Sequence, residues 1–535
     1  MTGGARGSGD ASGSGSSGGG GGERVGTPGG RVFVPPRPPH RWGLIAIATV
    51  LVATVAAPLG SWAVQRAGEC ADGVRKVAGG ECVGVTDGAY EFENLRGLGR
   101  KIHAENERVE RSGEPSVSIA YVEAMSGGSA DRGAETTRQA VGGAYLAQRA
   151  LNAEGDTLPK VRLLLANTGR GDRHWREVVD RLTESRSGER LVAVAGFGQS
   201  NDRTKEAVRK LRKAGLPMVG ATVADDGLGS RTAGFFRVSF PNRDQTSAAA
   251  RYIKAQQREH SGHRVLIVRD GNEEDTYNTS LYRDFRAAAR RERLDVDDQV
   301  VPYRSGEGEA SPTGNALSLA ADRVCDGDPP DVVFFAGRGR DLRRFIEAAG
   351  EGGRRCRTTV ISGSSTLGVY FDTRGERRRA DLERLRTRWE QSGVTVYYTA
   401  YAHPQIAEKV YGDEGGGGGP FAGFEKEYGR QVGGPGAALE SGQAMLGHDA
   451  VFTIGKAART AVQVYGTRRV TPRMVLAMLE QTSGSSRVRG VSGEIAFDPD
   501  TGEPVGRPLA LVELRRPPAP GGDGEKYRFV EAVTP

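Results

Sequence analysis

Polar side chains gather in a short loop, residues 198–201, between an apolar stretch and a segment with helical spacing. The loop reads Gly-Gln-Ser-Asn, so it contains Gln199 and Ser200. A helix that begins after the loop leaves backbone N–H groups unpaired and carries a partial positive charge at its N-terminus. We therefore predict a site for a carboxylate or another anion, to which the Ser200 hydroxyl adds a donor. The competing interpretation is that Ser200 or Asn201 caps the helix. Ser126, after an earlier apolar stretch, allows the same two interpretations.

The sequence contains no pattern that is typical of a catalytic site. The seven histidines are scattered, with no His-Glu-x-x-His motif and no Cys-His pairing. Residues 453–457 lack the glycine spacing and the hydroxyl of a phosphate-binding loop. We expect a binding protein rather than an enzyme, with no metal site and no cofactor. A net charge of +7 over 535 residues, with the two signs interspersed, indicates a solvated surface and no nucleic-acid partner.

The elements that position these loops follow a regular alternation. From residue 116 to residue 362, apolar stretches that predict strands alternate with amphipathic segments that predict helices. The alternation stops at an extended segment, 237–241, and then starts again. Alternation of this kind predicts parallel sheets with helices on both faces. We predict the α/β class, with two doubly wound, Rossmann-like lobes, and short antiparallel strands at the C-terminal end.

An uncharged apolar run, residues 44–60, separates a basic Gly/Ser/Pro-rich tail from the rest of the chain. With its flanking residues it is long enough to cross a hydrocarbon core of about 30 Å. We predict a disordered cytoplasmic tail over 1–42, a transmembrane helix over 43–64, and a single-pass protein of the cell membrane whose main domain lies outside. A cleaved signal peptide and a lipoprotein attached through Cys70 are the alternatives.

All four cysteines follow the apolar run, and in an exported chain they predict two disulfides. Cys70 and Cys82 bracket a short Gly-rich loop in a segment, 65–112, that we predict to be an extracytoplasmic stalk. Cys325 and Cys356 each precede a predicted strand, and neighbouring parallel strands would bring them together. The alternative is that the thiols are free and buried.

Seven segments, in order along about 400 residues, resemble type I periplasmic binding proteins of the branch that binds leucine, isoleucine, valine and amides for ABC transporters. An example is 195–200, Ala-Gly-Phe-Gly-Gln-Ser, which resembles the strand and loop that hold a ligand carboxylate. The other segments are 119–127, 150–152, 215–219, 236–245, 448–451 and 491–498. The resemblance implies two lobes joined by three crossings within residues 113–535, with a ligand between them. Lobe one would comprise 115–238 and 395–483, and lobe two 239–394 and 484–535.

The resemblance also implies further site residues. The loop 220–226 would form a second wall in lobe one, with Ala221 and Thr222 as the candidates. An ungapped match places Gly220 at the Ser of the family's Ser-Pro-Ala-Ala-Thr loop, whereas a shifted match places Thr222 at its Thr. Asp225 and Asp226, in the same loop, are expected in a solvated turn, with contact to a ligand ammonium as the alternative. Tyr277 would lie over the ligand, with a plain surface tyrosine as the alternative.

Ser364 stands where amino-acid binders of the family carry an acidic residue, which argues against a conventional branched-chain amino acid because a buried ammonium needs a counter-charge. Arg338 and Arg340 follow a predicted strand and are expected at the surface, with contact to an anionic ligand as the alternative. We expect a membrane-anchored protein that captures a small amino acid, amide or carboxylate for an ABC permease. The alternative is a ligand-sensing receptor of the same fold.

Overall fold

The computed structural model describes residues 68–534 except 128–132, 230–232, 261, 307–312, 354, 371–376, 413–418, 434–438, 520–521 and 523. The chain from Gly68 onward forms one compact unit. The predicted tail and transmembrane helix lie outside the described residues. Among the helices that are described, none combines the length and the apolar character needed to span a bilayer.

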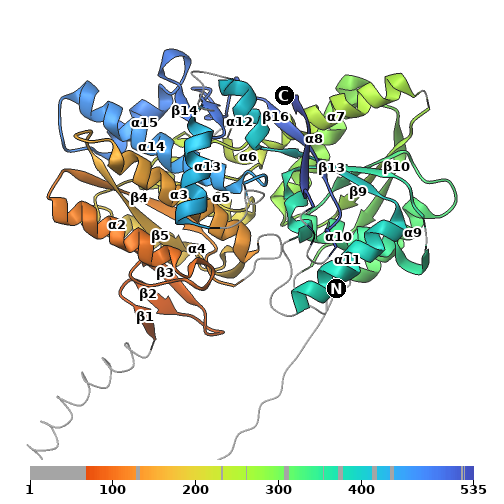
Figure 1. The fold of residues 1–535 in the computed structure, drawn as a ribbon, viewed down its shortest axis with the longest axis horizontal. Helices are drawn as coiled ribbons and strands as arrows, with labels where there is room; N and C mark the ends of the chain where they lie inside the picture. The colour runs from red at the N-terminus through yellow and green to blue at the C-terminus, as the bar shows by residue number, and fades with distance from the viewer. Residues whose placement is uncertain are drawn as a thin grey trace, which may run out of the picture. The chain divides into compact units, whose positions relative to one another are not determined.

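Lobe one is built on a sheet to which the described residues contribute eight strands (Figure 1), in the order β1-β2-β3-β5-β4-β6-β7-β8. The strands from β5 to β8 in this order are parallel, whereas β1, β2 and β3 are joined by antiparallel pairing and β3 runs antiparallel to β5. The strands are β1 (Glu69–Ala71), β2 (Val74–Lys76), β3 (Cys82–Thr86), β4 (Ser116–Glu123), β5 (Lys160–Asn167), β6 (Leu191–Gly196), β7 (Met218–Gly220) and β8 (Phe235–Arg237).

Helices cover both faces of this sheet because alternate residues of its strands are apolar on each face. Ile119 and Tyr121 of β4 pack in one core cluster with α3 and α14, whereas Ala120 and Val122 pack in another with α4 and α5. The helices of this lobe are α2 (Leu98–Ser112), α3 (Ala134–Ala153), α4 (Trp175–Ser185), α5 (Asp202–Lys213), α6 (Asp226–Gly229), α12 (Pro404–Tyr411), α13 (Gly419–Gln431), α14 (Gln443–Tyr465) and α15 (Pro472–Glu480).

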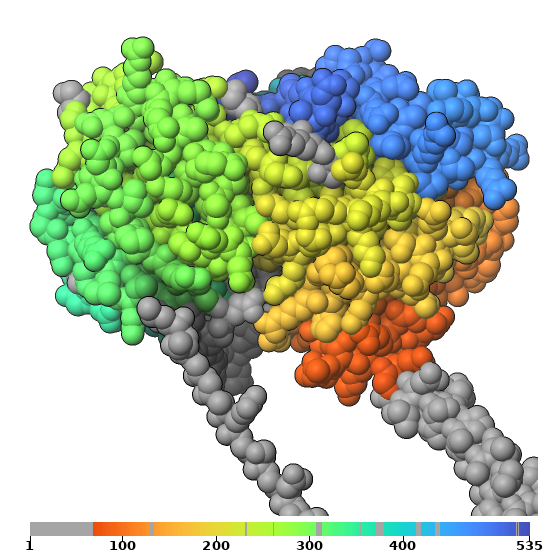
Figure 2. Space-filling view, turned by 180° about the vertical axis from the view of Figure 1, so that it is seen from behind, coloured from red at the N-terminus to blue at the C-terminus, as the bar shows by residue number. Residues whose placement is uncertain are grey.

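Lobe two has a second sheet, for which the described residues give the order β10-β9-β11-β12-β13-β16-β17. The strands from β10 to β13 are parallel, and β16 and β17 are antiparallel. The strands are β9 (Val265–Asp270), β10 (Val296–Tyr303), β11 (Val332–Ala336), β12 (Thr359–Ser362), β13 (Thr395–Ala400), β16 (Leu509–Leu514) and β17 (Tyr527–Val533). The helices are α7 (Asn242–Glu259), α8 (Thr276–Glu292), α9 (Thr313–Cys325), α10 (Gly339–Ala349) and α11 (Arg377–Ser392). Viewed from behind, lobe two forms one side of the unit (Figure 2).

The two predicted sheets and the α/β class are confirmed, but two predicted boundaries disagree with the strand pairing. Residues 65–112 do not form a separate stalk, because β1, β2 and β3 extend the sheet of lobe one and Leu98 and Ile102 of α2 lie in its core. The chain does not return to lobe one at residue 395, because β13 pairs with β12 in lobe two. The return therefore comes after Ala400.

Both predicted disulfides are present, Cys70–Cys82 and Cys325–Cys356. The first joins β1 to β3 at the edge of the lobe-one sheet. The second joins the end of α9 to the segment before β12, as expected for the starts of neighbouring parallel strands, since β11 and β12 are paired.

A buried ion pair ties together two of the segments that connect the lobes. Arg237, at the end of β8, is fully buried, and its Nε donates to Oε2 of Glu503 at 2.7 Å. Its other guanidinium nitrogens donate to Glu503 and to the backbone carbonyls of Val223 and Asp225. Because buried charges are stable only when they are paired and hydrogen-bonded, these contacts fix the register of the two connections.

Candidate functional site

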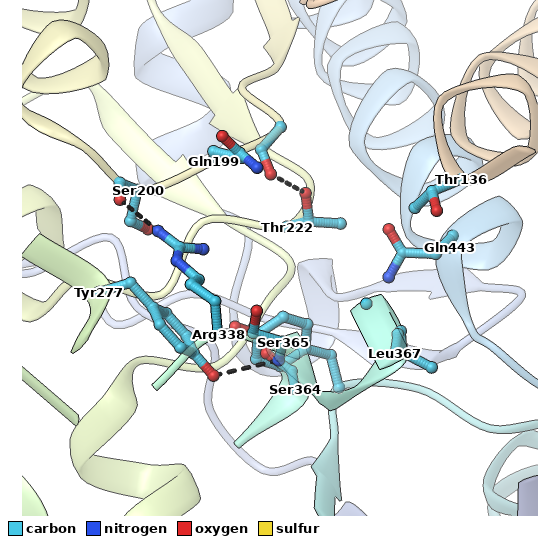
Figure 3. A pocket seen from close by; sticks show the side chains of 13 residues that line it. Thr136, Gln199, Ser200, Thr222, Tyr277, Arg338, Ser364, Ser365, Leu367 and Gln443 are labelled. Carbon is cyan, nitrogen blue, oxygen red and sulfur yellow. Dashed lines mark hydrogen bonds between the residues drawn. The ribbon is translucent and has the colours of Figure 1, made fainter. Parts of the chain in front are cut away.

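A small cavity of about 50 Å³ lies where the carboxyl ends of both sheets meet (Figure 3). Ligands of open α/β sheets bind at this edge, because the loops after the strands and the N-termini of the following helices face it. The lining residues come from both lobes and are mostly polar: Thr136, Gly198, Gln199, Ser200, Thr222, Tyr277, Arg338, Ser364, Ser365, Leu367, Gly368, Tyr401 and Gln443.

The lobe-one wall consists of the loops after β6 and β7. Ser200 is buried, and its Oγ accepts hydrogen bonds from the backbone N–H groups of Ala224 (2.9 Å) and Asp225 (3.1 Å). Asn201 caps α5, since its side chain accepts from the N–H of Thr204 at 2.8 Å. The two interpretations considered for this loop therefore apply to different residues. Asn201 caps the helix, whereas Ser200 lines the cavity and holds the loop after β7 in place.

Thr222 also lines the cavity, and its Oγ1 donates to the carbonyl of Gly198 at 3.0 Å. Of the two candidates in the loop 220–226, the structure places Thr222, and not Ala221, on the cavity wall. Ala221 is buried, and its backbone N–H donates to the carbonyl of Gly196 at 2.7 Å.

The lobe-two wall consists of the first turn of α8 and the 3-10 helix η4 (Ser364–Tyr370). Tyr277 is buried, and its hydroxyl accepts from the N–H of Ser365 at 3.1 Å. Burial raises the pKa of the Tyr277 phenol, so the ring is neutral. The N–H of Ser364 donates to Oε1 of Gln245 at 2.8 Å, which fixes the start of η4.

Arg338 connects the two walls, and its predicted surface position is wrong. It is only 7% exposed and follows β11. Its Nε and Nη2 donate to the two carboxylate oxygens of Asp275 at 2.7 and 2.9 Å, and Nη2 also donates to the backbone carbonyl of Ser200 at 2.9 Å. Its guanidinium carbon lies 4.5 Å from the centre of the Tyr277 ring, a cation–π arrangement. Arg340 lies on α10 and contacts Asp341 at 3.6 Å.

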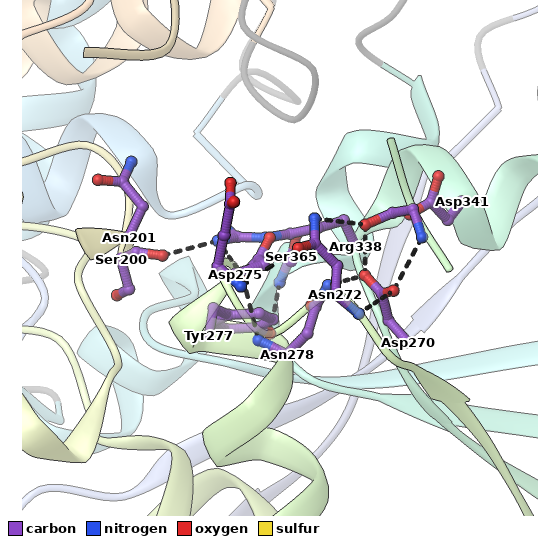
Figure 4. Close-up of polar contacts among 12 residues, drawn as sticks. Ser200, Asn201, Asp270, Asn272, Asp275, Tyr277, Asn278, Arg338, Asp341 and Ser365 are labelled. Carbon is purple, nitrogen blue, oxygen red and sulfur yellow. Dashed lines mark hydrogen bonds and ion pairs between the residues drawn. The ribbon is translucent and has the colours of Figure 1, made fainter. Parts of the chain in front are cut away.

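A network behind Arg338 holds this wall rigid (Figure 4). Asp275 caps α8, accepting from the N–H of Asn278 at 3.2 Å. The Asn278 side chain in turn donates to the buried carboxylate of Asp270, at the end of β9, at 2.7 Å. Asp270 also accepts from the Ser305 hydroxyl at 2.6 Å. Each residue of this network is hydrogen-bonded to its neighbours, so the network holds the Arg338 guanidinium and the Tyr277 ring in one defined position.

Five of the seven predicted ligand-binding residues line the cavity: Gln199, Ser200, Thr222, Tyr277 and Ser364. Ser126 does not. Its hydroxyl donates to Oε1 of Glu81 at 2.7 Å and accepts from Asn167, so it braces the loops next to β3 and β5. Whether the five residues bind a ligand stays a prediction.

The sequence led us to expect Asp225 and Asp226 in a solvated turn, and this prediction is wrong. Asp225 is 3% exposed and pairs with Nζ of Lys205 at 2.7 Å. Asp226 lies next to Asp284 of lobe two. Burial, followed by a hydrogen bond to Asp284, raises the pKa of Asp226 to about 8. Neither residue lines the cavity.

Sequence reasoning missed several lining residues. Thr136 and Gln443 lie in the first turns of α3 and α14, and Tyr401 follows β13. Ser365 and Leu367 lie in the 3-10 helix η4, which follows β12. A position directly after a strand was a usable signal for Tyr401, as it was for Arg338. Within the described residues, no cluster of three or more His, Cys, Asp or Glu side chains is arranged to hold a metal ion.

A model of the family of periplasmic binding proteins matches residues 116–523. The chain belongs to this family. A comparison with curated proteins gives no match.

Solved structures with the same fold include leucine- and isoleucine-binding proteins. The leucine-binding protein LivK of Thermotoga maritima has a TM-score of 0.57 at 18% identity, covering 78% of this chain and 99% of its own. LivJ of Streptococcus pneumoniae, in complex with isoleucine, has a TM-score of 0.56 at 17% identity, covering 78% and 100%. A solute-binding protein of R. palustris, in complex with 4-hydroxybenzoate, has a TM-score of 0.55 at 14% identity, covering 78% and 97%. At these identities the likeness shows the fold of this periplasmic binding protein and not its ligand.

Proposed function

We propose that this protein captures a small polar solute between its lobes outside the cell membrane and delivers it to an ABC permease. The observation that carries the proposal is the interlobe cavity, whose polar walls come from both lobes and meet at the Arg338–Ser200 hydrogen bond. Solute-binding proteins need such a cleft, because closure on a ligand requires contacts from each side. The anchor is the apolar run at 43–64, which is predicted from the sequence.

The charges around the cavity favour a carboxylate or a neutral amide over a zwitterionic amino acid. Arg338 supplies the charged side chain among the described residues that line the cavity, and Ser364 replaces the acidic residue expected of an amino-acid binder. The Asp275 carboxylate is already held by two hydrogen bonds from Arg338 and does not line the cavity, so an ammonium group placed here would have no counter-charge on the cavity wall, which is costly in a buried site. A carboxylate fits the arginine and the hydroxyls around it.

Calorimetric titration of the full-length protein in detergent tests the proposal, with four matched ligands: an aromatic carboxylate, an aliphatic carboxylate, its amide, and leucine. We expect the carboxylates or the amide to bind and to raise the unfolding temperature with concentration. Thr222→Val should weaken that binding, whereas Thr279→Val, on the same lobe-two helix as Tyr277 but outside the lining, should not. Tight binding of leucine alone would contradict the ligand class, and no binding by any small polar solute would contradict the capture function.

A ligand-sensing receptor is the second candidate, because a permanent anchor serves a sensor as well as a transporter. Uptake of the identified ligand separates the two. Loss of uptake in cells that lack the gene supports delivery to a permease, whereas unchanged uptake supports sensing.

A further inference from the structure

A groove lined by arginines lies on lobe one, at the edge of the sheet opposite to the ligand cavity. Its volume is about 770 Å³, which is within the range of ligand sites. The cavity follows the carboxyl ends of β6 and β7, whereas the groove is formed at the amino ends of β4 and β6 and at the start of α15. In Figure 1, β4 and α15 lie on the side of lobe one that faces away from lobe two.

Arginines stand on both walls of this groove. Arg186 and Arg190 come from the segment between α4 and β6. Arg468 and Arg469 come from the segment between α14 and α15, and Arg473 lies in the first turn of α15. All five are exposed. The groove lining contains no aspartate or glutamate, and within the described part of the chain none of the five arginines forms an ion pair with a carboxylate.

Two acidic residues close to the groove arginines along the chain have other partners. Glu189, next to Arg190, accepts from Nη1 of Arg162 at 3.2 Å. Asp180, on α4, pairs with Lys210. The positive charge of the groove arginines is therefore not neutralised locally. Arginines of lobe two differ in this respect, because they pair with carboxylates, such as Arg264 with Asp328 at 2.8 Å.

Two of the arginines occupy positions that the local structure disfavours. Arg190 has a φ of 53°, in the left-handed region that favours glycine, and its backbone is held there because its carbonyl accepts from the N–H of Ser118 at 2.9 Å. Arg473 lies in the first turn of α15, where a cation opposes the helix dipole. A bound anion near the start of α15 would offset the cost at Arg473.

The shape of the groove indicates what kind of anion it fits. Its inner surface is apolar, formed by buried residues that include Val117, Leu191 and Val192. Arginines on two facing walls over an apolar floor suit a linear chain with anionic groups on both sides, and they do not suit a flat bilayer surface. Guanidinium groups bind phosphate oxygens in bidentate pairs, and the five cations are all arginine rather than lysine.

We propose that this groove binds a linear phosphate polymer, and that it does so independently of the ligand cavity. Binding there would hold lobe one against an anionic polymer while lobe two stays free to open and close. The groove and the cavity lie at opposite edges of one sheet, so occupation of one leaves the loops of the other in place.

The test measures binding of long-chain inorganic polyphosphate to the full-length protein by biolayer interferometry over a range of salt concentrations. Arg190→Gly removes one groove charge and relieves the left-handed backbone. Its matched control is Arg293→Gly in lobe two, an exposed arginine with the same φ of 53°. We expect Arg190→Gly to weaken binding about tenfold, the scale of one charged hydrogen bond, and to lower the salt slope by about one. Arg293→Gly should leave both unchanged.

Arg469→Gln, in an exposed loop, gives a second groove variant that does not touch the backbone of Arg190, and it should weaken polyphosphate binding similarly. Poly-glutamate and phosphatidylglycerol vesicles complete the test. Equal or tighter binding of poly-glutamate would assign the groove to an acidic protein segment, and binding of vesicles alone would assign it to a membrane. Either result overturns the proposal, as does a groove variant that binds polyphosphate as the Arg293→Gly control does.

Discussion

The Nη2 atom of Arg338 donates a 2.9 Å hydrogen bond to the backbone carbonyl of Ser200, and this contact joins the lobe-two wall of the cavity to the lobe-one wall. The same guanidinium is held by both carboxylate oxygens of Asp275. Arg338 therefore bridges the two faces of the cleft and is positioned before any ligand arrives. The position of Arg338 therefore bears both on lobe closure and on the charge of the ligand.

Replacement of Arg338 by alanine should open the cleft and weaken anion binding. The change leaves the Asp275 carboxylate without its guanidinium partner and removes the contact to Ser200. We expect the radius of gyration from small-angle X-ray scattering to increase and the affinity for a carboxylate ligand to fall at least about tenfold. Arg344→Ala, on the helix α10 that Arg338 directly precedes but outside the cavity lining, is the control. Unchanged scattering and affinity in Arg338→Ala would show that the bridge is not functional.

Glu503→Gln should destabilise the fold strongly, because it leaves the fully buried Arg237 without its counter-charge. Loss of one partner of a buried ion pair costs about 3–5 kcal/mol. Urea unfolding of the variant should show this as a lower midpoint with an unchanged slope. Glu206→Gln removes a pair between half-exposed side chains, Glu206 and Arg209, and should cost less than about 1 kcal/mol. Equal losses in the two variants would contradict the structural role of Arg237.

The contact between Asp226 of lobe one and Asp284 of lobe two should make stability fall as the pH rises. Burial and the hydrogen bond to Asp284 raise the pKa of Asp226 to about 8, against the opposing effect of Arg237 and Arg243. The unfolded value is about 3.9. The native state therefore keeps a proton that the unfolded chain releases, so this contribution is fully present below pH about 4 and is lost as the pH rises through about 8.

Urea unfolding between pH 5 and pH 9 checks this sign. Asp226→Asn should remove that part of the decline, whereas Asp298→Asn, at an exposed position on β10, should leave the pH profile of the parent protein unchanged. A parent profile that rises over this range, with the two variants alike, would count against a shared proton between the lobes.

The two disulfides should stabilise the protein to different extents. Cys325 and Cys356 are 31 residues apart and Cys70 and Cys82 are 12 apart. The chain-entropy relation gives about 4 kcal/mol for the longer loop and about 3 kcal/mol for the shorter one. We expect the double serine variant of Cys325 and Cys356 to unfold at a lower urea concentration than that of Cys70 and Cys82. The reverse order would show that the edge of the lobe-one sheet depends on its disulfide more than loop length predicts.

Much of the fold follows from hydrophobic periodicity. The apolar run at 117–122 became β4 and the helical spacing at 138–152 became α3, because long, strongly patterned segments resist other interpretations. The short strands β1 and β2 were missed, since three residues are too few for alternation to show. α2 had a usable signal, the buried positions Leu98, Ile102 and Val109, which its many charged residues obscure.

Site residues could be predicted from the sequence where their place depends on the order of strands and loops along the chain. They could not be predicted where their place depends on contacts with residues far away in the sequence. Ser200, in a loop after an apolar stretch, and Thr222, implied by the family resemblance, were both predicted, and both line the cavity. Arg338 also follows a strand, but its inward orientation depends on Asp275, 63 residues earlier, and on Ser200, 138 residues earlier. Ser126 was misplaced for the same reason, because its partner Glu81 belongs to a segment that the sequence did not connect to the lobe.

The three antiparallel strands β1, β2 and β3 determine how a force applied to the N-terminal segment would be transmitted to the lobe. A pull on the chain before Gly68 acts first on β1, and the Cys70–Cys82 bridge passes it directly to β3 without separating β1 from β2. β3 in turn is paired with β5 inside the sheet. A force applied to the chain before Gly68 would therefore reach the interior of the lobe-one sheet through covalent bonds and would bypass the short strand pairing at its edge.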